Sequence, residues 1–184
     1  DKHKPNVPGR YYLQASYTDK GGVDGLPRLT TKKVVVLRAP LISADKFSEG
    51  KKVMAFHVSS EDNPMGDEEM DLLIANGGGW ASYGDIDLKG IRTIKAQVAL
   101  APQMTAGGTI TVRSGHPNTG KVIAQATIKQ GISTYGINDV MLPITDAETG
   151  ARPLYFNFTA DSDAPDAVLG AVLTIEFLRT EVSK

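Results

Sequence analysis

Short stretches of alternating apolar and polar residues, separated by glycine- and proline-rich segments, constrain the fold of this chain more than any other feature. Apolar residues at every second position place one face of a strand against a core. The 184 residues include 19 glycines and 10 prolines, spread throughout the chain. No long segment shows the 3.6-residue apolar period of an amphipathic helix. The pattern therefore predicts an all-β protein.

Ten strands are expected after residue 40. They are predicted at residues 41–47, 52–58, 70–75, 79–83, 91–100, 108–113, 121–129, 138–144, 153–159 and 169–179. Turn residues separate several of them, at 77–79 (GGG), 106–108 (AGG) and 116–120 (HPNTG). Evenly spaced short strands with such turns favour a β-sandwich.

Two further strands are expected ahead of this region, at residues 11–17 (YYLQASY) and 33–38 (KVVVLR). Ala39-Pro40 follows them, and proline interrupts a strand ladder because it lacks an amide hydrogen. Two strands alone do not make a stable domain. We therefore expect residues 1–39 to be a β segment or linker, either the tail of a preceding immunoglobulin-like module or an arm packed on the next one. Residues 40–184 are expected to form the main module.

Composition and charge exclude several classes of protein. The formal net charge of −1 provides no basic face for nucleic acid. The chain has no cysteine, which excludes disulfides, thiol nucleophiles and Cys-ligated zinc. No apolar run approaches the roughly 20 residues of a membrane span. Because the chain opens without methionine, we expect a mature or truncated start, with any targeting signal outside this sequence.

No recognised catalytic motif is present. The sequence contains no G-x-S-x-G elbow, H-E-x-x-H pair, P-loop or G-x-G-x-x-G turn. The three histidines, His3, His57 and His116, lie far apart, which favours structural or solvated roles. The acidic residues 61–69 (EDNPMGDEE) lack the spacing of an EF-hand, and a solvated loop is favoured. We therefore expect a protein that is not an enzyme, with unrecognised catalytic carboxylates as an alternative.

The aromatic residues supply the best candidates for a binding site. The single tryptophan, Trp80, follows three glycines and precedes Tyr83, and Tyr135 follows a second glycine-containing segment. Glycine beside an aromatic ring lets a flat ligand approach the backbone, and a sugar can stack its apolar face on the ring. The alternative, that Trp80 and Tyr83 pack in the sandwich core, stays open.

Five stretches, in this order, resemble the family 6 carbohydrate-binding modules, which are calcium-containing β-jelly rolls. They are residues 42–47 (ISADKF), 78–88 (GGWASYGDIDL), 108–124 (GTITVRSGHPNTGKVIA), 154–158 (LYFNF) and 175–177 (IEF). Together they span about residues 41–179. The resemblance implies a jelly-roll β-sandwich that binds polysaccharide or oligosaccharide without catalysis.

Residues 10–40 are similar to segments that precede such modules in large exported bacterial proteins, including pyrroloquinoline-quinone sugar dehydrogenases and glycosidases. The resemblance implies an accessory module of an exported glycan-active or sugar-oxidising protein, with the other domains of that protein as partners. Its location would be extracytoplasmic: secreted, on the cell surface or in the periplasm. A structural spacer or protein-interaction module that has lost its sugar site is the alternative function.

The resemblance also implies where a glycan would bind. The site is expected in the segments from Trp80 to Tyr83 and from Tyr135 to Asn138, with Tyr135 stacked on a sugar ring. Asn138 or Asp139 would hydrogen-bond the sugar hydroxyls.

The chain departs from the family at several ligand positions. Residues 72–74 (LLI), 131–135 (GISTY) and 170–174 (GAVLT) lack the tyrosine, tryptophan and asparagine that the family usually carries there. Weak glycan binding is therefore expected. Asp45 matches the family's opening acidic position and is the best candidate calcium ligand, but Leu173 stands where an acidic partner is expected. Since calcium takes six to eight oxygens, we expect weak or absent calcium binding.

Overall fold

The structure of the protein is a computed structural model that describes residues 10–21, 27–101, 105–129, 135–146, 150–162 and 167–179. Every regular element within these ranges is a β-strand, which confirms the predicted all-β class. Contacts divide the chain into two compact units, residues 1–40 and 41–184. Within the described ranges, no helix is long and apolar enough to cross a membrane.

The first unit is an antiparallel hairpin of β1 (Arg10–Thr18) and β2 (Thr30–Arg38). Where β1 ends and β2 begins, the hydroxyls of Thr18 and Thr30 lie 2.8 Å apart. The Asp19 carboxylate accepts hydrogen bonds from two backbone amides of the turn, at 2.9 and 3.0 Å. The two strands predicted ahead of the main module are therefore present and pair with each other.

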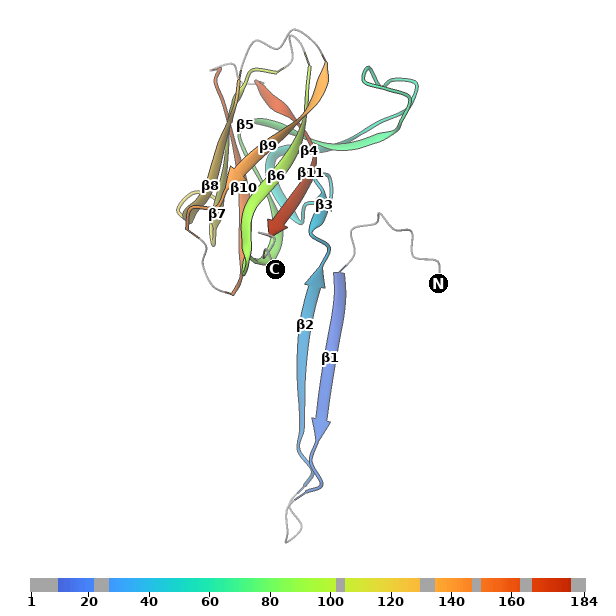
Figure 1. The fold of residues 1–184 in the computed structure, drawn as a ribbon, viewed down its shortest axis with the longest axis vertical. Helices are drawn as coiled ribbons and strands as arrows, with labels where there is room; N and C mark the ends of the chain where they lie inside the picture. Colours follow the sequence, from blue (N-terminus) through green and yellow to red (C-terminus); the bar gives the residue numbers. More distant parts are fainter. Residues whose placement is uncertain are drawn as a thin grey trace, which may run out of the picture. The chain divides into compact units, whose positions relative to one another are not determined.

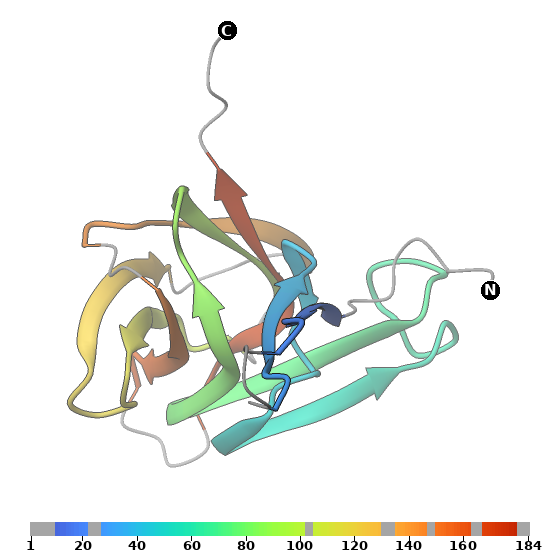
Figure 2. The same ribbon diagram turned by 90° about the horizontal axis from the view of Figure 1, so that it is seen from below.

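The second unit is one antiparallel sheet that folds over into two layers (Figures 1 and 2). Its strands are β3 (Leu41–Ser43), β4 (Glu49–Val58), β5 (Met70–Asp87), β6 (Ile91–Leu100), β7 (Gly108–Ser114), β8 (Lys121–Ile128), β9 (Gly136–Pro143), β10 (Ala151–Ala160) and β11 (Val168–Arg179). The hydrogen-bonded order is β8-β7-β10-β5-β11-β6-β9, with β3 paired to β11 and β4 to β5. A bridge between Ala124 and Ile144 brings the two ends together. The predicted sandwich is confirmed.

One prediction about the strands is wrong. The two strands expected at residues 70–75 and 79–83, with a glycine turn between them, form the single strand β5 of 18 residues. The first half of β5 pairs with β11, and the second half pairs with β10. β5 therefore belongs to both layers, which we call the β11 layer (with β6, β9 and β3) and the β10 layer (with β7 and β8).

The three glycines bend β5 instead of reversing it. Gly78 has a positive φ of 75°. A Cβ atom on Gly79 would lie 2.7 Å from the Lys52 carbonyl oxygen and 2.9 Å from those of Lys51 and Asn76. The facing strand β4 is irregular at the same level, between Lys51 and Val53. Both strands therefore bend together, and the close approach of their backbones leaves no room for a side chain.

The core lies between the two layers and follows the alternation of the strands. In β7, every second residue from Gly108 to Ser114 is buried. Tyr83 and Phe156 meet edge to face, with ring centroids 5.5 Å apart. The largest fully buried side chains are Tyr83, Phe156, Phe158, Leu73, Ile94, Ile110, Ile123, Leu142, Leu154, Leu169, Ile175 and Val98.

Replacing Gly79 by alanine is expected to lower the free energy of unfolding by about 2 kcal/mol, the typical cost of overpacking. The added methyl group would press on backbone of both strands, which cannot move as a flexible side chain can. Gly136→Ala is the matched control, because a Cβ on Gly136 meets nothing within 4 Å. Urea denaturation of both variants measures the difference. Equal stability of the two would show that the bend does not require glycine.

Candidate functional site

The outer surface of the β10 layer collects polar and aromatic side chains from neighbouring strands. In β10, Leu154, Phe156 and Phe158 are buried, so Tyr155 and Asn157 lie on the outer side. Asn157 is opposite Trp80 of β5 and Thr111 of β7, and Tyr155 is opposite Ser82 and Arg113. Lys51 of β4 is opposite Trp80. We call the surface formed by Lys51, Trp80, Arg113, Tyr155 and Asn157 the aromatic face.

Two partly exposed rings form a corner at the centre of this face. The ring centroids of Trp80 and Tyr155 lie 5.4 Å apart, with their planes at 76°. Such an edge-to-face pair holds both rings in defined orientations. Lys51, on the other side of Trp80, adds an ammonium group with three hydrogen-bond donors. The arrangement presents apolar ring surface next to polar groups.

The loop between β7 and β8 is held against the aromatic face by two side chains. Asn157 donates from Nδ2 to the Pro117 carbonyl at 2.7 Å, and Arg113 donates from Nη1 to the Gly120 carbonyl at 2.8 Å. Oδ1 of Asn157 is buried, with no hydrogen-bond donor among the described residues. A buried acceptor of this kind is rare in proteins and is often satisfied by a water molecule or ligand.

The structure separates the predicted site residues Trp80 and Tyr83. Trp80 lies on the aromatic face, whereas only 2% of Tyr83 is exposed. The Tyr83 hydroxyl donates to the Ala44 carbonyl at 2.8 Å. Burial raises the pKa of Tyr83, and the negative charge of Asp45 raises it further. Tyr83 is therefore a core residue whose ring offers no surface to a ligand, and we correct its assignment to the site.

The other predicted site residues lie on or beside β9. Tyr135 is 50% exposed immediately before this strand, and Asn138 and Asp139 are exposed within it. Their strand belongs to the β11 layer, where Asp139 is opposite Gln97 of β6. Strand pairing therefore does not bring them to the sheet face that carries Trp80. Residues 131–134, which precede Tyr135 in the chain, lie outside the described residues.

Asp45, the candidate calcium ligand, is already engaged by neighbouring side chains. Its carboxylate accepts a hydrogen bond from the Ser43 hydroxyl and pairs with Lys46. The hydrogen bond to Asp45, together with its charge, raises the pKa of Lys46. In the parts of the chain that are described, no three His, Cys, Asp or Glu side chains lie close enough to hold a metal ion. Calcium takes six to eight oxygens, so a site at Asp45 would need further oxygen donors besides this carboxylate.

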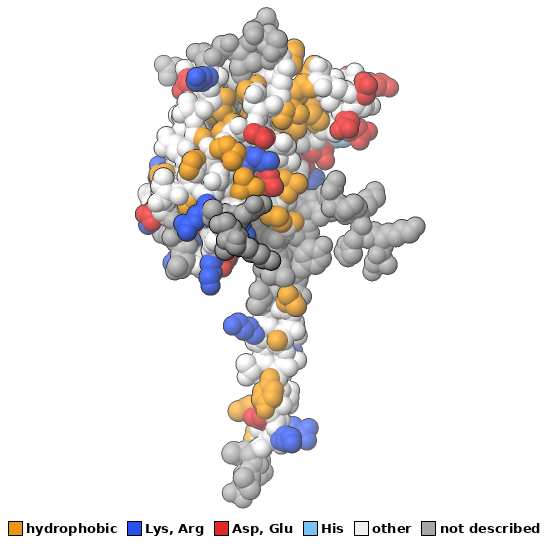
Figure 3. Space-filling view, viewed as in Figure 1, with side chains coloured by type: hydrophobic (Ala, Val, Ile, Leu, Met, Phe, Trp, Pro, Cys, Tyr) orange, Lys and Arg blue, Asp and Glu red, His pale blue; other side chains and the backbone are white. Residues whose placement is uncertain are grey.

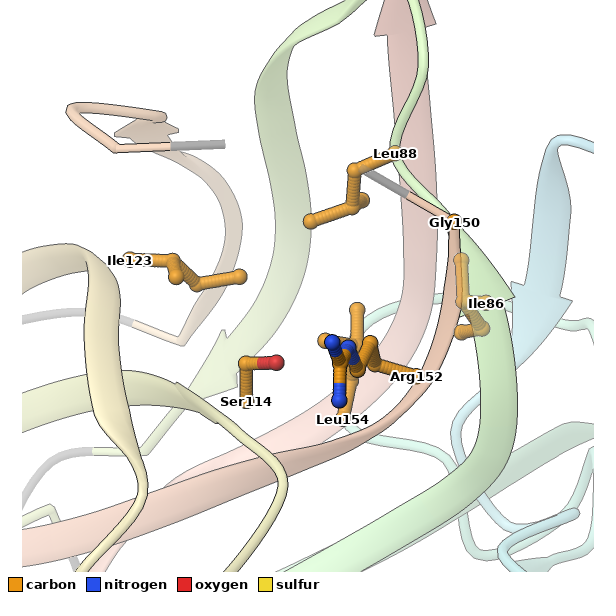
Figure 4. A pocket seen from close by; sticks show the side chains of 7 residues that line it. All are labelled: Ile86, Leu88, Ser114, Ile123, Gly150, Arg152 and Leu154. Atoms are coloured by element: carbon orange, nitrogen blue, oxygen red, sulfur yellow. The ribbon is translucent and has the colours of Figure 1, made fainter. Parts of the chain in front are cut away.

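A small hollow lies at one end of the sandwich (Figure 4). It encloses about 190 Å³ of empty space, open solvent included, which is less than the roughly 300–1,000 Å³ of small-molecule sites. Its lining is largely aliphatic and consists of Ile86, Leu88, Ser114, Ile123, Gly150, Arg152 and Leu154. The hollow offers no aromatic platform, so the aromatic face remains the candidate site.

Four members of the aromatic face were not predicted from the sequence: Lys51, Arg113, Tyr155 and Asn157. For Tyr155 and Asn157 a signal was present, because residues 154–158 (LYFNF) alternate and their apolar residues face the core. Tyr155 and Asn157 lie near Trp80 only because β10 pairs with β5. These two strands are far apart in the sequence, so their pairing leaves no local signal.

Comparison with protein families matches the chain to one family model. The model described as "Carbohydrate binding module (family 6)" matches residues 54–170, which is more than half of the chain. Comparison with curated proteins found no match.

Several solved structures share the fold. A family 6 module from Clostridium cellulolyticum, in complex with xylose, has 20% sequence identity, covers 76% of this chain and 96% of its own, and has a TM-score of 0.58. A β-1,3-glucan-binding module from Bacillus halodurans has 20% identity, with coverages of 74% and 93% and a TM-score of 0.59. An arabinoxylan arabinofuranohydrolase of glycoside hydrolase family 43 from Bacillus subtilis has 22% identity and a TM-score of 0.57, and the match covers 76% of this chain and 27% of that one.

Removal of divalent cations is expected to leave the melting temperature unchanged. A bound ion present at 100 times its dissociation constant would stabilise the fold by about 2.7 kcal/mol, which corresponds to several degrees. Thermal unfolding followed by circular dichroism, in EDTA and in excess calcium, measures the effect. A melting temperature several degrees higher in calcium would show that a site exists despite the engaged carboxylate of Asp45.

Proposed function

Because the chain belongs to the family 6 carbohydrate-binding modules, we propose that it binds a neutral polysaccharide on the aromatic face and does so without catalysis. The observation that carries the proposal is the corner formed by Trp80 and Tyr155, two rings 5.4 Å apart and partly open to solvent. The polymer would thereby be held near the other domains of a larger glycan-active protein.

The chemistry of a sugar ring matches this corner. A pyranose has an apolar face of C–H groups and a rim of hydroxyls, so it can stack on an aromatic ring while its edge remains hydrogen-bonded. Favourable aromatic contacts contribute roughly 0.5–1.5 kcal/mol each beyond the area they bury. Lys51 next to Trp80, and Thr111 and Gln125 further along the same row of strands, supply donors and acceptors for the hydroxyls.

The charges on this face favour a neutral glycan. Lys51 and Arg113 are balanced in part by Glu49, which is opposite Ser82 at the margin of the face. One guanidinium nitrogen of Arg113 is already bonded to the loop. A charged polysaccharide would need a large excess of the opposite sign, and this set of residues has an excess of only one positive charge.

The solved relatives support a β-linked glycan as the ligand class. The structures with the same fold include one with xylose, one that binds β-1,3-glucan and one with cellobiose. In the arabinofuranohydrolase, the matched part is 27% of the chain, as expected if the fold serves there as one part of a larger enzyme. We extend this arrangement to the present chain and place it outside the cytoplasm, where polysaccharide substrates occur.

Replacing Trp80 or Tyr155 by alanine is expected to weaken glycan binding about fivefold or more, because each loses a stacking contact of about 1 kcal/mol. Titration calorimetry with xylotetraose, cellotetraose and a β-1,3-glucan tetraose measures the binding. Tyr135→Ala is the control, since Tyr135 is an exposed tyrosine beside the other layer.

Two outcomes would contradict the proposal. Loss of binding in Tyr135→Ala, with Trp80→Ala and Tyr155→Ala unaffected, would place the site beside β9. Absence of binding by the unmodified chain to every glycan would instead support the structural spacer. Circular dichroism of each variant establishes that a loss of binding is not a loss of folding.

A further inference from the structure

β4 is an edge strand with an open side. Within the described part of the chain it pairs only with β5. Eight of its ten residues are exposed, all except Val53 and Val58. Figure 2 shows β4 along the margin of the sandwich, outside β5. The free backbone amides and carbonyls of such an edge can pair with another strand.

The middle of this edge strand is apolar. Met54 is 53% exposed and Phe56 is 47% exposed. They are two residues apart, so they lie on the same side of the strand. Figure 3 shows acidic side chains on the loop that protrudes from the second unit. Natural edge strands usually carry charges at their centre to prevent pairing, and β4 has none there.

The two ends of the edge carry opposite charges. Exposed Lys51 and Lys52 lie near its beginning, together with Glu49. Beyond its end follow six carboxylates with no lysine or arginine among them: Glu61, Asp62, Asp67, Glu68, Glu69 and Asp71. The edge is therefore basic at one end, apolar in the middle and acidic at the other end.

We propose that two copies of this chain pair through β4 in antiparallel fashion, around a two-fold axis. A strand whose two ends have opposite charge is complementary to itself when a second copy runs in the reverse direction. With the axis at Ala55, Met54 of one copy lies directly opposite Phe56 of the partner subunit, a cross-strand apolar pair. In this register Lys52 and Lys51 of one copy lie opposite Val58 and Ser59 of the partner subunit, directly before its acidic residues 61–71. This inference does not depend on glycan binding.

Analytical ultracentrifugation of the full chain, without glycan, is expected to show a concentration-dependent dimer. Phe56→Lys places two like charges beside the axis and should weaken the dimer by at least about tenfold. Ile137→Lys is the matched control, because Ile137 is also 47% exposed and lies on β9 in the same unit. The control should dimerise as the unmodified chain does.

Charge reversal tests the antiparallel direction. Lys51→Glu with Lys52→Glu should weaken the dimer, and so should Glu61→Lys with Glu69→Lys. An equimolar mixture of these two double variants should form heterodimers, since each then meets the opposite charge. A monomeric unmodified chain, equal effects of Phe56→Lys and Ile137→Lys, or no heterodimer in the mixture would each overturn the proposal.

Discussion

The bend of β5 at residues 77–79 is the constraint on which the rest of the second unit depends. It allows one strand to pair with β11 in one layer and with β10 in the other. Alternation continues through the bend, so that Leu73 and Tyr83 both face the core, while Ile74 and Trp80 lie outside. The same backbone approach that excludes a side chain at Gly79 therefore brings Trp80 to the outer side of the β10 layer.

The alternating pattern was sufficient to predict the strands, because one buried face leaves a local signal at every second residue. It failed at the glycine triplet, which resembles a turn when only neighbouring residues are considered. What makes it a bend is the matching irregularity of β4 between Lys51 and Val53, a contact between strands. Long-range pairing of this kind leaves no mark in the local sequence.

The site was predicted only in part, for the same reason. The spacing of three residues puts Trp80 and Tyr83 on opposite sides of a strand, but it does not show which of them faces the core. Burial of Tyr83 is decided by its contact with Phe156 and its hydrogen bond to the Ala44 carbonyl. Tyr155 becomes a neighbour of Trp80 only through the pairing of β10 with β5. The aromatic residues and the neighbouring glycines suggested a surface on which a sugar can stack. The register of the strands determines which aromatic rings form that surface.

The most direct test of the account uses the single tryptophan of the chain as a reporter. Its indole N–H gives one resonance in a two-dimensional nitrogen–proton spectrum, and this resonance can be followed while a β-linked tetrasaccharide is added. The account predicts that the Trp80 indole signal and the backbone amides around Tyr155 shift together and saturate with one dissociation constant. Shifts confined to the amides of β9 from Gly136 to Asp139, with the indole signal unchanged, would contradict it.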